Sequence, residues 1–380
     1  MKIVIAPNAF KNSLDATAVA EAISKGLLQS KLDCETICFP VGDGGDGTGV
    51  LLTTHFNGKK IVTSVYDPLH RIIESSFGFI EESKTAIIEM ADASGLRLLK
   101  PEEYDPLHAT TFGTGELIKA ALDKGANKII ICIGGSATVD AATGILQSLG
   151  ARFFDVNENE LQHLPGSLKN IHAVNLLELD KRILQTELIV LCDVENTLLG
   201  EHGAAKIFGP QKGATNDDVK LLEDGFKKLC NIVYDESGKD MSMIKHGGAA
   251  GGVAAGLHTF LNAKLANGID HFLEITKFDN AIKDADLLIT GEGSIDLQTL
   301  EGKAPYGVAV AAKKYKLPVI AFAGKVPLIT KEKLNQYFDV LLPISNEAMD
   351  LSTAMQYTYE NLVRTAKMLG DLLSMKNNFE

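Results

Sequence analysis

The strongest constraint on the fold of this 380-residue chain is the alternation of short Val/Ile/Leu runs with helical patterns. Continuous apolar runs of four to six residues are typical of strands buried on both faces of a parallel sheet. Near the two ends of the chain, such runs predict strands at Ile3–Ala6, Thr36–Pro40, Leu287–Thr290, Val319–Ala323 and Val340–Pro343. The segments between them leave room for the crossover connections that parallel strands need. We therefore expect both ends of the chain to build one α/β domain.

The middle of the chain has a different pattern. Runs with short links at Ile61–Val65, Ile72–Ile80 and Thr85–Met90 are typical of an antiparallel meander, and further strands and helices follow. The length favours two domains. We predict that residues 1–65 and 271–380 form one domain, that residues 66–270 form a second α/β domain inserted into it, and that a cleft lies between them. The alternative is two consecutive domains that meet near residues 155–185.

Charge and cysteine usage narrow the function classes. The formal net charge is −12, and an acidic surface repels nucleic acids and anionic lipids. The five cysteines are irregularly spaced and form no C-x-x-C pair, which favours a reducing compartment over a disulfide scaffold. No apolar run approaches 18 residues, and the N-terminus lacks a signal-peptide pattern. We expect a cytoplasmic protein with no membrane or nucleic-acid partner.

Glycine-rich loops after apolar strands are the places to look for ligands, because parallel strands end at one edge of a sheet and helices begin there. The first loop, residues 41–48, reads Val-Gly-Asp-Gly-Gly-Asp-Gly-Thr and formally matches the dinucleotide pattern G-x-G-x-x-G. Its carboxylates would repel a pyrophosphate unless a cation lay between them. Asp43 and Asp46 therefore suit magnesium or substrate hydroxyls, with Gly44 and Gly45 allowing close approach. The alternative is an acidic turn that caps the next helix.

The second loop follows the run Ile129–Ile133. Its glycines and hydroxyls are suited to hold a phosphate or carboxylate on backbone N–H groups, and the candidate residues are Gly134, Gly135, Ser136 and Thr138. Simple helix capping by Ser136 is the alternative. A similar arrangement at residues 111–116 precedes another expected helix.

The third loop follows Leu287–Thr290 and carries two acids, two hydroxyl residues and a lysine. Its candidate binding residues are Gly291, Glu292, Gly293, Ser294 and Lys303. Asp296 is the candidate catalytic base or metal ligand, and Lys303 is a candidate phosphate partner. This number of polar groups exceeds what a turn requires.

Further candidates are isolated. Lys11 and Ser13 follow the first strand, and Asp193 follows the run Leu188–Leu191. Lys212 lies between glycines in residues 208–214, where it could contact an anion or belong to a surface turn. The chain has no Walker A motif, no protein-kinase motif set and no G-x-S-x-G elbow.

Taken together, these segments resemble the bacterial glycerate kinase family. The resemblance is carried in order by residues 7–14, 43–48, 134–138, 208–214, 248–252, 290–296, 298–299 and 302–305. It implies phosphorylation of the small molecule D-glycerate to a phosphoglycerate, with ATP and Mg²⁺. It also implies a Rossmann/flavodoxin-like domain together with a restriction-endonuclease-like domain, in agreement with the expected insertion. A monomer or a homodimer is compatible with the sequence.

The chain departs from the family pattern at Asn8, at residues 139–142 and at Ser294, where the family carries Arg. Arg would be a natural partner for a carboxylate or phosphate. A kinase for a related small hydroxy acid and a non-catalytic organic-acid sensor are therefore alternatives. An NAD-dependent oxidoreductase is disfavoured, because no acidic residue occurs near 62–66 to bind the ribose.

The resulting mechanistic hypothesis follows the needs of phosphoryl transfer, which are positioning and charge neutralisation. Asp296, with Asp43 or Asp193 as rivals, would orient the metal or accept the hydroxyl proton. Lys11 and Lys303 would neutralise charge on the phosphoryl oxygens. Backbone N–H groups of the 134–138 loop would hold phosphate or the glycerate carboxylate.

Overall fold

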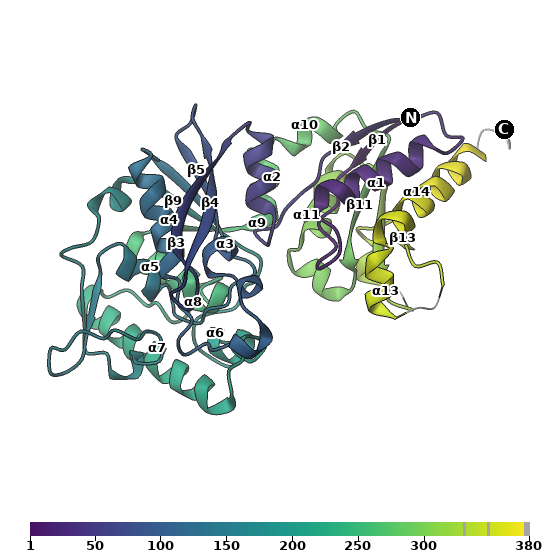
Figure 1. Ribbon diagram of the computed structural model, residues 1–380. Helices are drawn as coiled ribbons and strands as arrows, with labels where there is room; N and C mark the ends of the chain where they lie inside the picture. The colour runs from purple at the N-terminus through teal and green to yellow at the C-terminus, as the bar shows by residue number, and fades with distance from the viewer. Residues whose placement is uncertain (330–331, 348–349, 376–380) are drawn as a thin grey trace. The chain divides into compact units, whose positions relative to one another are not determined.

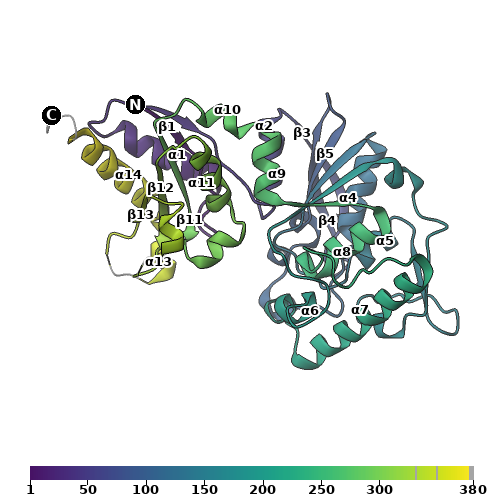
Figure 2. The same cartoon turned by 180° about the vertical axis from the view of Figure 1, so that it is seen from behind.

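The computed structural model describes residues 1–329, 332–347 and 350–375. The chain divides into two compact units. Unit 1 contains Met1–Asp43 and the chain from Ile269 onward, and unit 2 contains Gly44–Gly268. In Figures 1 and 2, unit 1 therefore combines the purple start of the chain with its green and yellow end, whereas unit 2 is blue to teal.

Unit 1 is built on a five-stranded sheet in the order β13-β12-β11-β1-β2, in which every neighbouring pair is parallel. Its strands are β1 (Lys2–Ile5), β2 (Glu35–Cys38), β11 (Leu287–Ser294), β12 (Val319–Lys325) and β13 (Val340–Pro343). The apolar residues of β1 and β11 are fully or almost fully buried, as expected for inner strands covered on both faces. The five strands predicted from the ends of the sequence are confirmed.

Helices cover this sheet, and unit 1 contains α1 (Ala16–Leu28), α9 (Gly268–Ile275), α10 (Phe278–Ile282), η6 (Leu297–Glu301), α11 (Ala304–Lys314), α12 (Glu332–Asn335), α13 (Leu351–Gln356) and α14 (Thr358–Ser374). Helices α1 and α14 lie side by side (Figure 1) although they come from opposite ends of the chain. They approach closely at Gly26, where a Cβ atom would overlap the backbone oxygen of Val363. The last long helix therefore closes a core that the first helix begins.

Unit 2 is built on a six-stranded mixed sheet in the order β10-β9-β6-β5-β4-β3. Its strands are β3 (Lys59–Tyr66), β4 (Ile72–Ile80), β5 (Thr85–Glu89), β6 (Lys128–Cys132), β9 (Glu187–Cys192) and β10 (Lys264–Asn267). The β3-β4-β5 meander is antiparallel, as predicted, and β5, β6, β9 and β10 are parallel. The parallel strands β6 and β9 end at one edge, where the 134–138 loop and the segment that begins at Asp193 follow them.

The remaining elements of unit 2 pack around this sheet or flank it (Figure 2). They are α2 (Thr48–His55), α3 (Ala91–Ser94), η1 (Leu96–Leu98), η2 (Pro101–Glu103), α4 (Phe112–Asp123), α5 (Thr143–Ser148), β7 (Arg152–Phe154), η3 (Leu168–Asn170), β8 (Ala173–Asn175), η4 (Lys181–Gln185), α6 (Ala204–Phe208), η5 (Pro210–Lys212), α7 (Asn216–Ser237) and α8 (Ala249–Leu261). One buried apolar cluster joins the sheet to α4, α5, α7 and α8.

The division into units differs from the predicted boundary after residue 65. Residues 44–65 belong to unit 2, because β3 forms the edge of the unit 2 sheet and pairs with β4 from Lys59–Phe79 to Tyr66–Ile72. A strand pairs with the neighbouring strand that satisfies its backbone hydrogen bonds. The spacing of residues along the sequence does not show which strand that is.

Two glycine segments have a different local structure from the one expected. Residues 112–116 lie inside α4, and a Cβ atom at Gly113 would overlap the backbone oxygen of Tyr66, so these glycines serve helix packing. After the second loop, residues 137–142 are not helical, and α5 begins only at Thr143. The 134–138 loop is therefore not followed directly by a helix N-terminus.

Candidate functional site

In unit 1, the carboxyl ends of β1, β2 and β11 bring three predicted polar segments together. The backbone N–H of Asn8 donates to the Gly291 carbonyl at 2.9 Å, and the Asn8 amide donates to the Asp43 carboxylate at 3.0 Å. The same carboxylate accepts a long hydrogen bond, 3.4 Å, from the N–H of Ala304 at the start of α11. Asp43 is thus fixed at the sheet edge by two segments distant in sequence.

Glu292 is the most perturbed acid of this edge. It is 8% exposed, and its carboxylate accepts a hydrogen bond of 2.7 Å from the Thr299 hydroxyl. Burial raises the pKa of Glu292 to about 6, although the positive charges of Lys303 and Lys11 oppose this shift. The negative charge of Asp43 adds to it. A buried carboxyl that titrates near neutrality beside two lysines is typical of a functional site.

Other predicted residues of unit 1 have structural roles in this arrangement. The Asp296 carboxylate caps η6 by accepting from the Gln298 N–H at 2.8 Å, and the Thr299 side chain reaches back to the N–H of Asp296. The Ser13 hydroxyl contacts the Met355 carbonyl and the Thr358 hydroxyl at 2.7 and 2.6 Å. Ser13 therefore holds the C-terminal helices. The carboxylate of Asp296 keeps acceptor capacity beyond its cap.

In unit 2, the acidic loop and the 134–138 loop are packed backbone to backbone. The Gly134 N–H donates to the Gly44 carbonyl at 3.1 Å, and a Cβ atom at Gly134 would lie 2.5 Å from the Cα atom of Gly45. Gly135 adopts φ +69°, and a Cβ atom there would overlap the Asp46 carboxylate. Glycine takes a positive φ without strain and allows the close backbone contact at Gly134. The glycines predicted to bind ligand also bring the two loops together.

Lys212 lies beneath the 134–138 loop and is 3% exposed. Its ammonium donates to the Ser136 hydroxyl and to the Thr138 carbonyl, each at 2.7 Å. Burial lowers the pKa of Lys212 to about 7, and the negative charge of Asp140 partly offsets this effect. The interpretation of Lys212 as a surface turn is wrong. Its motif in residues 208–214 was the only signal in the sequence.

The 134–138 loop keeps two free backbone donors. Within the described part of the chain, the N–H groups of Gly135 and Ser136 donate no hydrogen bond. Successive backbone N–H groups with a positive-φ residue form the kind of concavity that binds anions. The Thr138 side chain is fully buried and its hydroxyl has no partner, so it supports the loop from inside. Asp193 directly follows β9 at the same sheet edge.

Asp140 organises the chain behind this loop and was noted in the sequence only as a departure from the family pattern. Its fully buried carboxylate accepts from the N–H and hydroxyl of Thr111, and from the N–H groups of Ala142 and Gly144. Burial raises the pKa of Asp140 despite these hydrogen bonds. The carboxylate joins the start of α4 to the start of α5.

The expected magnesium ligands can be tested against the structure. The described residues contain no group of three or more His, Cys, Asp or Glu side chains placed to hold a metal ion. Magnesium in phosphotransfer sites commonly takes one or two carboxylates and completes its shell with phosphate and water. Asp43 beside Glu292 fits that requirement. Asp46 instead lies 3.8 Å from the Arg97 guanidinium and is half exposed.

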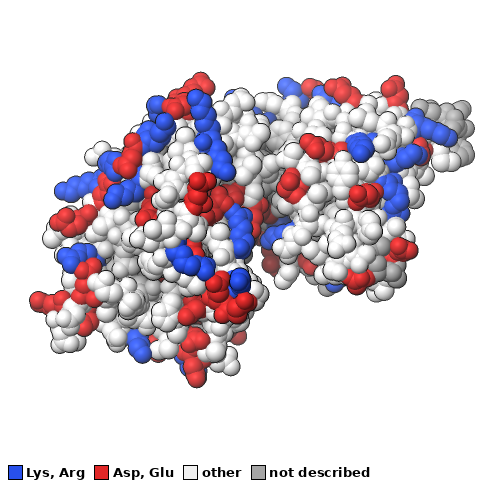
Figure 3. Space-filling view, in the orientation of Figure 1, with Lys and Arg blue, Asp and Glu red and all other residues white. Residues whose placement is uncertain are grey.

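Basic and acidic side chains are interspersed over the face shown in Figure 3. An anionic ligand would thus depend on local donors such as Lys11, Lys303 and the 134–138 loop rather than on a long-range positive field. Among the described residues, no helix has the length and hydropathy to cross a membrane. The five cysteines are all free thiols, and Cys132, Cys192 and Cys230 are buried.

These features define an α/β protein whose parallel-strand edges present lysines, carboxylates and a backbone anion site, the parts that a small-molecule phosphotransferase requires. Comparison with known proteins gives the family. The model of the glycerate kinase family matches residues 3–374, and this chain belongs to that family.

Relatives match over nearly their full length. A glycerate kinase of Bacillus subtilis is 42% identical over 367 residues, which cover 97% of this chain and 96% of the relative. Glycerate 2-kinase of Escherichia coli is 40% identical over 379 residues, which cover 99% of this chain and 98% of the relative. A crystal structure described as a glycerate kinase 2 from Salmonella typhimurium LT2 superposes with a TM-score of 0.85 at 38% identity, covering 100% of this chain and 99% of that one. The expected family and fold class are confirmed.

Proposed function

We propose that this protein transfers the γ-phosphate of ATP to a hydroxyl group of D-glycerate. The observation that carries the proposal is the family match over residues 3–374, together with relatives of about 40% identity named as glycerate kinases. The name of the Escherichia coli relative favours the 2-hydroxyl as the acceptor. Organic-acid phosphorylation in the cytoplasm accords with the five free thiols.

The unit 1 edge is proposed to bind the phosphates of ATP. Lys11 and Lys303 supply positive charge, and Asp43 with Glu292 supplies carboxylate oxygens for Mg²⁺. Bound magnesium would neutralise charge on the phosphate oxygens. A Cβ atom at Gly293 would meet nothing closer than 3.8 Å, so the space beside this residue is open to a ligand, whereas a Cβ atom at Gly291 would overlap the Phe322 carbonyl of β12.

The 134–138 loop is proposed to bind the phosphoryl group as it is transferred. The free N–H groups of Gly135 and Ser136 would donate to its oxygens, and Lys212 keeps the loop in shape from below. Asp296 remains the candidate base, with Asp193 as its rival. Both assignments rest on position, because each residue follows a buried strand at its carboxyl end.

A coupled assay of ADP release from ATP with D-glycerate tests the function. We expect turnover that requires glycerate, with 2-phosphoglycerate identified as the product by ³¹P NMR. Turnover with another hydroxy acid but not with glycerate would favour the related-kinase alternative. Saturable binding of an acid with no ADP release would favour a sensor and contradict the proposal.

A further inference from the structure

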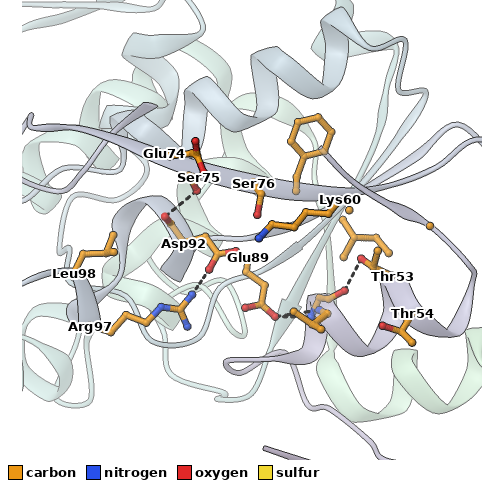
Figure 4. Close-up of a pocket in the computed structure, with 16 residues that line it drawn as sticks. Thr53, Thr54, Lys60, Glu74, Ser75, Ser76, Glu89, Asp92, Arg97 and Leu98 are labelled. Atoms are coloured by element: carbon orange, nitrogen blue, oxygen red, sulfur yellow. Dashed lines mark hydrogen bonds and ion pairs between the residues drawn. The ribbon is translucent and has the colours of Figure 1, made fainter. Parts of the chain in front are cut away.

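A polar cavity lies in unit 2, on the β3-β4-β5 side of the sheet. Its volume is about 620 Å³, and it lies between α2, the three strands and the α3–η1 segment (Figure 4). Gly78 of β4 pairs with Lys60 of β3 and lets the Thr53 side chain of α2 pack closely against the strand, while Phe77 and Ile87 contribute apolar surface. Few of the side chains that line it were singled out from the sequence.

The cavity carries both signs of charge. Lys60 and Arg97 are its cations, and Glu74, Glu89 and Asp92 are its carboxylates. In Figure 4 the Lys60 side chain extends toward Asp92, and the Ser76 hydroxyl points into the same space. Within the described residues, the Lys60 ammonium donates no hydrogen bond and forms no close ion pair, although its charge acts on Asp92, whereas Arg97 pairs directly with Asp92. Lys60 thus offers three free donors, and Arg97 has donors beyond those used for Asp92.

Two of the carboxylates are already committed. The Glu89 carboxylate is 6% exposed and accepts from the Gly49 N–H at 2.7 Å, so it caps the start of α2. The Asp92 carboxylate pairs with Arg97, and the Asp92 backbone carbonyl accepts from the Ser75 hydroxyl at 2.8 Å, which fixes α3 against β4. These bonds hold the walls in place without consuming Lys60, Ser76 or the outer oxygen of Asp92. The cavity is preorganised for a ligand that brings one anion and several hydroxyls.

We propose that this cavity binds the acceptor substrate, a small hydroxy acid, with its carboxylate on Lys60 and Arg97 and its hydroxyls on Ser76 and Asp92. This inference rests on the proposed phosphotransfer function. The three carboxylates that line the cavity would repel a triphosphate. A purely apolar ligand would desolvate the cations Lys60 and Arg97 without offering them a hydrogen-bond acceptor, which is also unfavourable. A hydroxylated monocarboxylate satisfies both kinds of group at once.

The segment that carries Arg97 contacts the proposed phosphoryl site. Leu96, next to Arg97, donates its N–H to the Gly135 carbonyl at 2.9 Å, and Ala137 donates to the Ser94 carbonyl at 2.9 Å. Arg97 also lies 3.8 Å from Asp46 of the acidic loop. A hydroxyl of an acid held at Arg97 therefore lies near the loop that would hold the phosphoryl group. Binding of the acceptor substrate and binding of the phosphoryl group are thus assigned to neighbouring parts of unit 2.

The size of the cavity extends the substrate class. Its volume corresponds to roughly 20 water molecules at ~30 Å³ each, which is more than a three-carbon acid displaces. Longer sugar acids with the same carboxylate and hydroxyl pattern fit the same space. We expect gluconate to compete with D-glycerate for this cavity.

The test uses Lys60→Met in the full chain, with Lys59→Met as the matched control. Successive strand side chains point to opposite faces, and Lys59 does not line the cavity. Lys59→Met therefore removes the same charge from the same strand and leaves the cavity lining unchanged. Calorimetric titration with D-glycerate in the absence of nucleotide gives Kd, and steady-state assays give both KM values. We expect Kd and KM for glycerate to rise about tenfold or more in Lys60→Met, with KM for ATP unchanged.

The outcomes separate this inference from the proposed function. If Lys60→Met and Ser76→Ala bind and turn over glycerate as the wild type does, the acceptor site is elsewhere and the inference is overturned. If the wild type binds glycerate in a Lys60-dependent manner but releases no ADP, the cavity assignment stands and the kinase proposal fails. Equal loss in Lys59→Met and Lys60→Met also overturns the inference, because it shows a general charge effect.

Discussion

The ammonium of Lys212 lies 2.7 Å from the hydroxyl oxygen of Ser136, although the two residues are 76 positions apart in the chain. The same ammonium reaches the Thr138 carbonyl at 2.7 Å. One buried cation therefore ties the η5 segment to the middle and the end of the 134–138 loop, in which the N–H groups of Gly135 and Ser136 donate no hydrogen bond. Such a contact supports the loop and adds positive charge behind an anion site, and the two contributions can be separated experimentally.

Replacing Lys212 by Met should lower kcat/KM by about tenfold or more, because the loop loses two hydrogen bonds and the charge behind it. The pKa of about 7 means that the wild-type ammonium loses its proton as the pH rises through 7. We therefore expect wild-type kcat/KM to fall on the alkaline side of that value. Lys212→Arg, which stays charged, should lack this limb.

Stability gives an independent check on the same residue. The folded pKa lies below the ordinary lysine value, so between about pH 7 and about 10.4 the unfolded chain binds a proton that the folded chain does not. Urea unfolding should then show a contribution to wild-type stability that rises with pH over that interval. A Lys212→Met variant with the same slope as the wild type would contradict the lowered pKa.

Glu292→Gln should remove an acidic limb from the pH–rate profile. The raised pKa of about 6 means that the functional carboxylate is lost as the pH falls through 6. Below that value the wild type should lose activity, and KM for Mg²⁺ should rise. The variant should have weak, pH-independent magnesium binding over the same range, with exposed Glu301→Gln as the control. An unchanged profile in Glu292→Gln would exclude it as a metal ligand.

The folded protein also binds the Glu292 proton more tightly than the unfolded chain does. Glu292 therefore contributes a stability term that decreases as the pH rises from about 4.3 to about 6. Gln can still accept the hydrogen bond from Thr299 without this cost. We expect Glu292→Gln to be at least as stable as the wild type at pH 7 in thermal unfolding, so lost activity could not be attributed to unfolding.

Gly135→Ala should separate the acidic loop from the 134–138 loop. The new Cβ atom would overlap the Asp46 carboxylate and would have to adopt φ +69°. Gly125→Ala is the matched control, because Gly125 has φ +87° with nothing within 4 Å of a Cβ atom. Both should lose ~1 kcal/mol or more of unfolding free energy from backbone strain. Only Gly135→Ala should also lose activity. Equal kcat/KM values in the two variants would show that the contact between the acidic loop and the 134–138 loop is not needed for catalysis.

Asp296→Asn tests the candidate base. Asn caps helices nearly as well as Asp, so η6 should survive and the melting temperature should change little. A base or metal ligand should nevertheless cost about 10²-fold or more in kcat. Turnover near the wild-type rate in this variant, with η6 intact, would show that Asp296 acts only as the N-cap of η6. Asp193→Asn should be measured in parallel as the rival assignment.

The sequence predicted those features that depend on residues close in the chain. The apolar runs of β1, β11 and β12 form strands at the expected positions. The short links between the next apolar runs correctly predicted the β3-β4-β5 meander. The glycine loops after Cys38 and Cys132 were also found where they were expected, whereas Gly291 to Ser294, expected as a loop, continue strand β11. These predictions succeeded because burial on both faces, turn geometry and positive φ each leave a local signature.

Tertiary structure decided what depends on partners far along the chain. Whether residues 44–65 belong to unit 1 or unit 2 was settled by the pairing of β3 with β4, and Ser13 was assigned to the C-terminal helices by contacts with Met355 and Thr358. The cavity at Lys60 has no local pattern in the sequence, because its walls come from α2, three strands and the α3–η1 segment. Hydrogen-bond partners and desolvation are non-local quantities, so the buried charge of Lys212 and the raised pKa of Glu292 emerge only once the chain has folded.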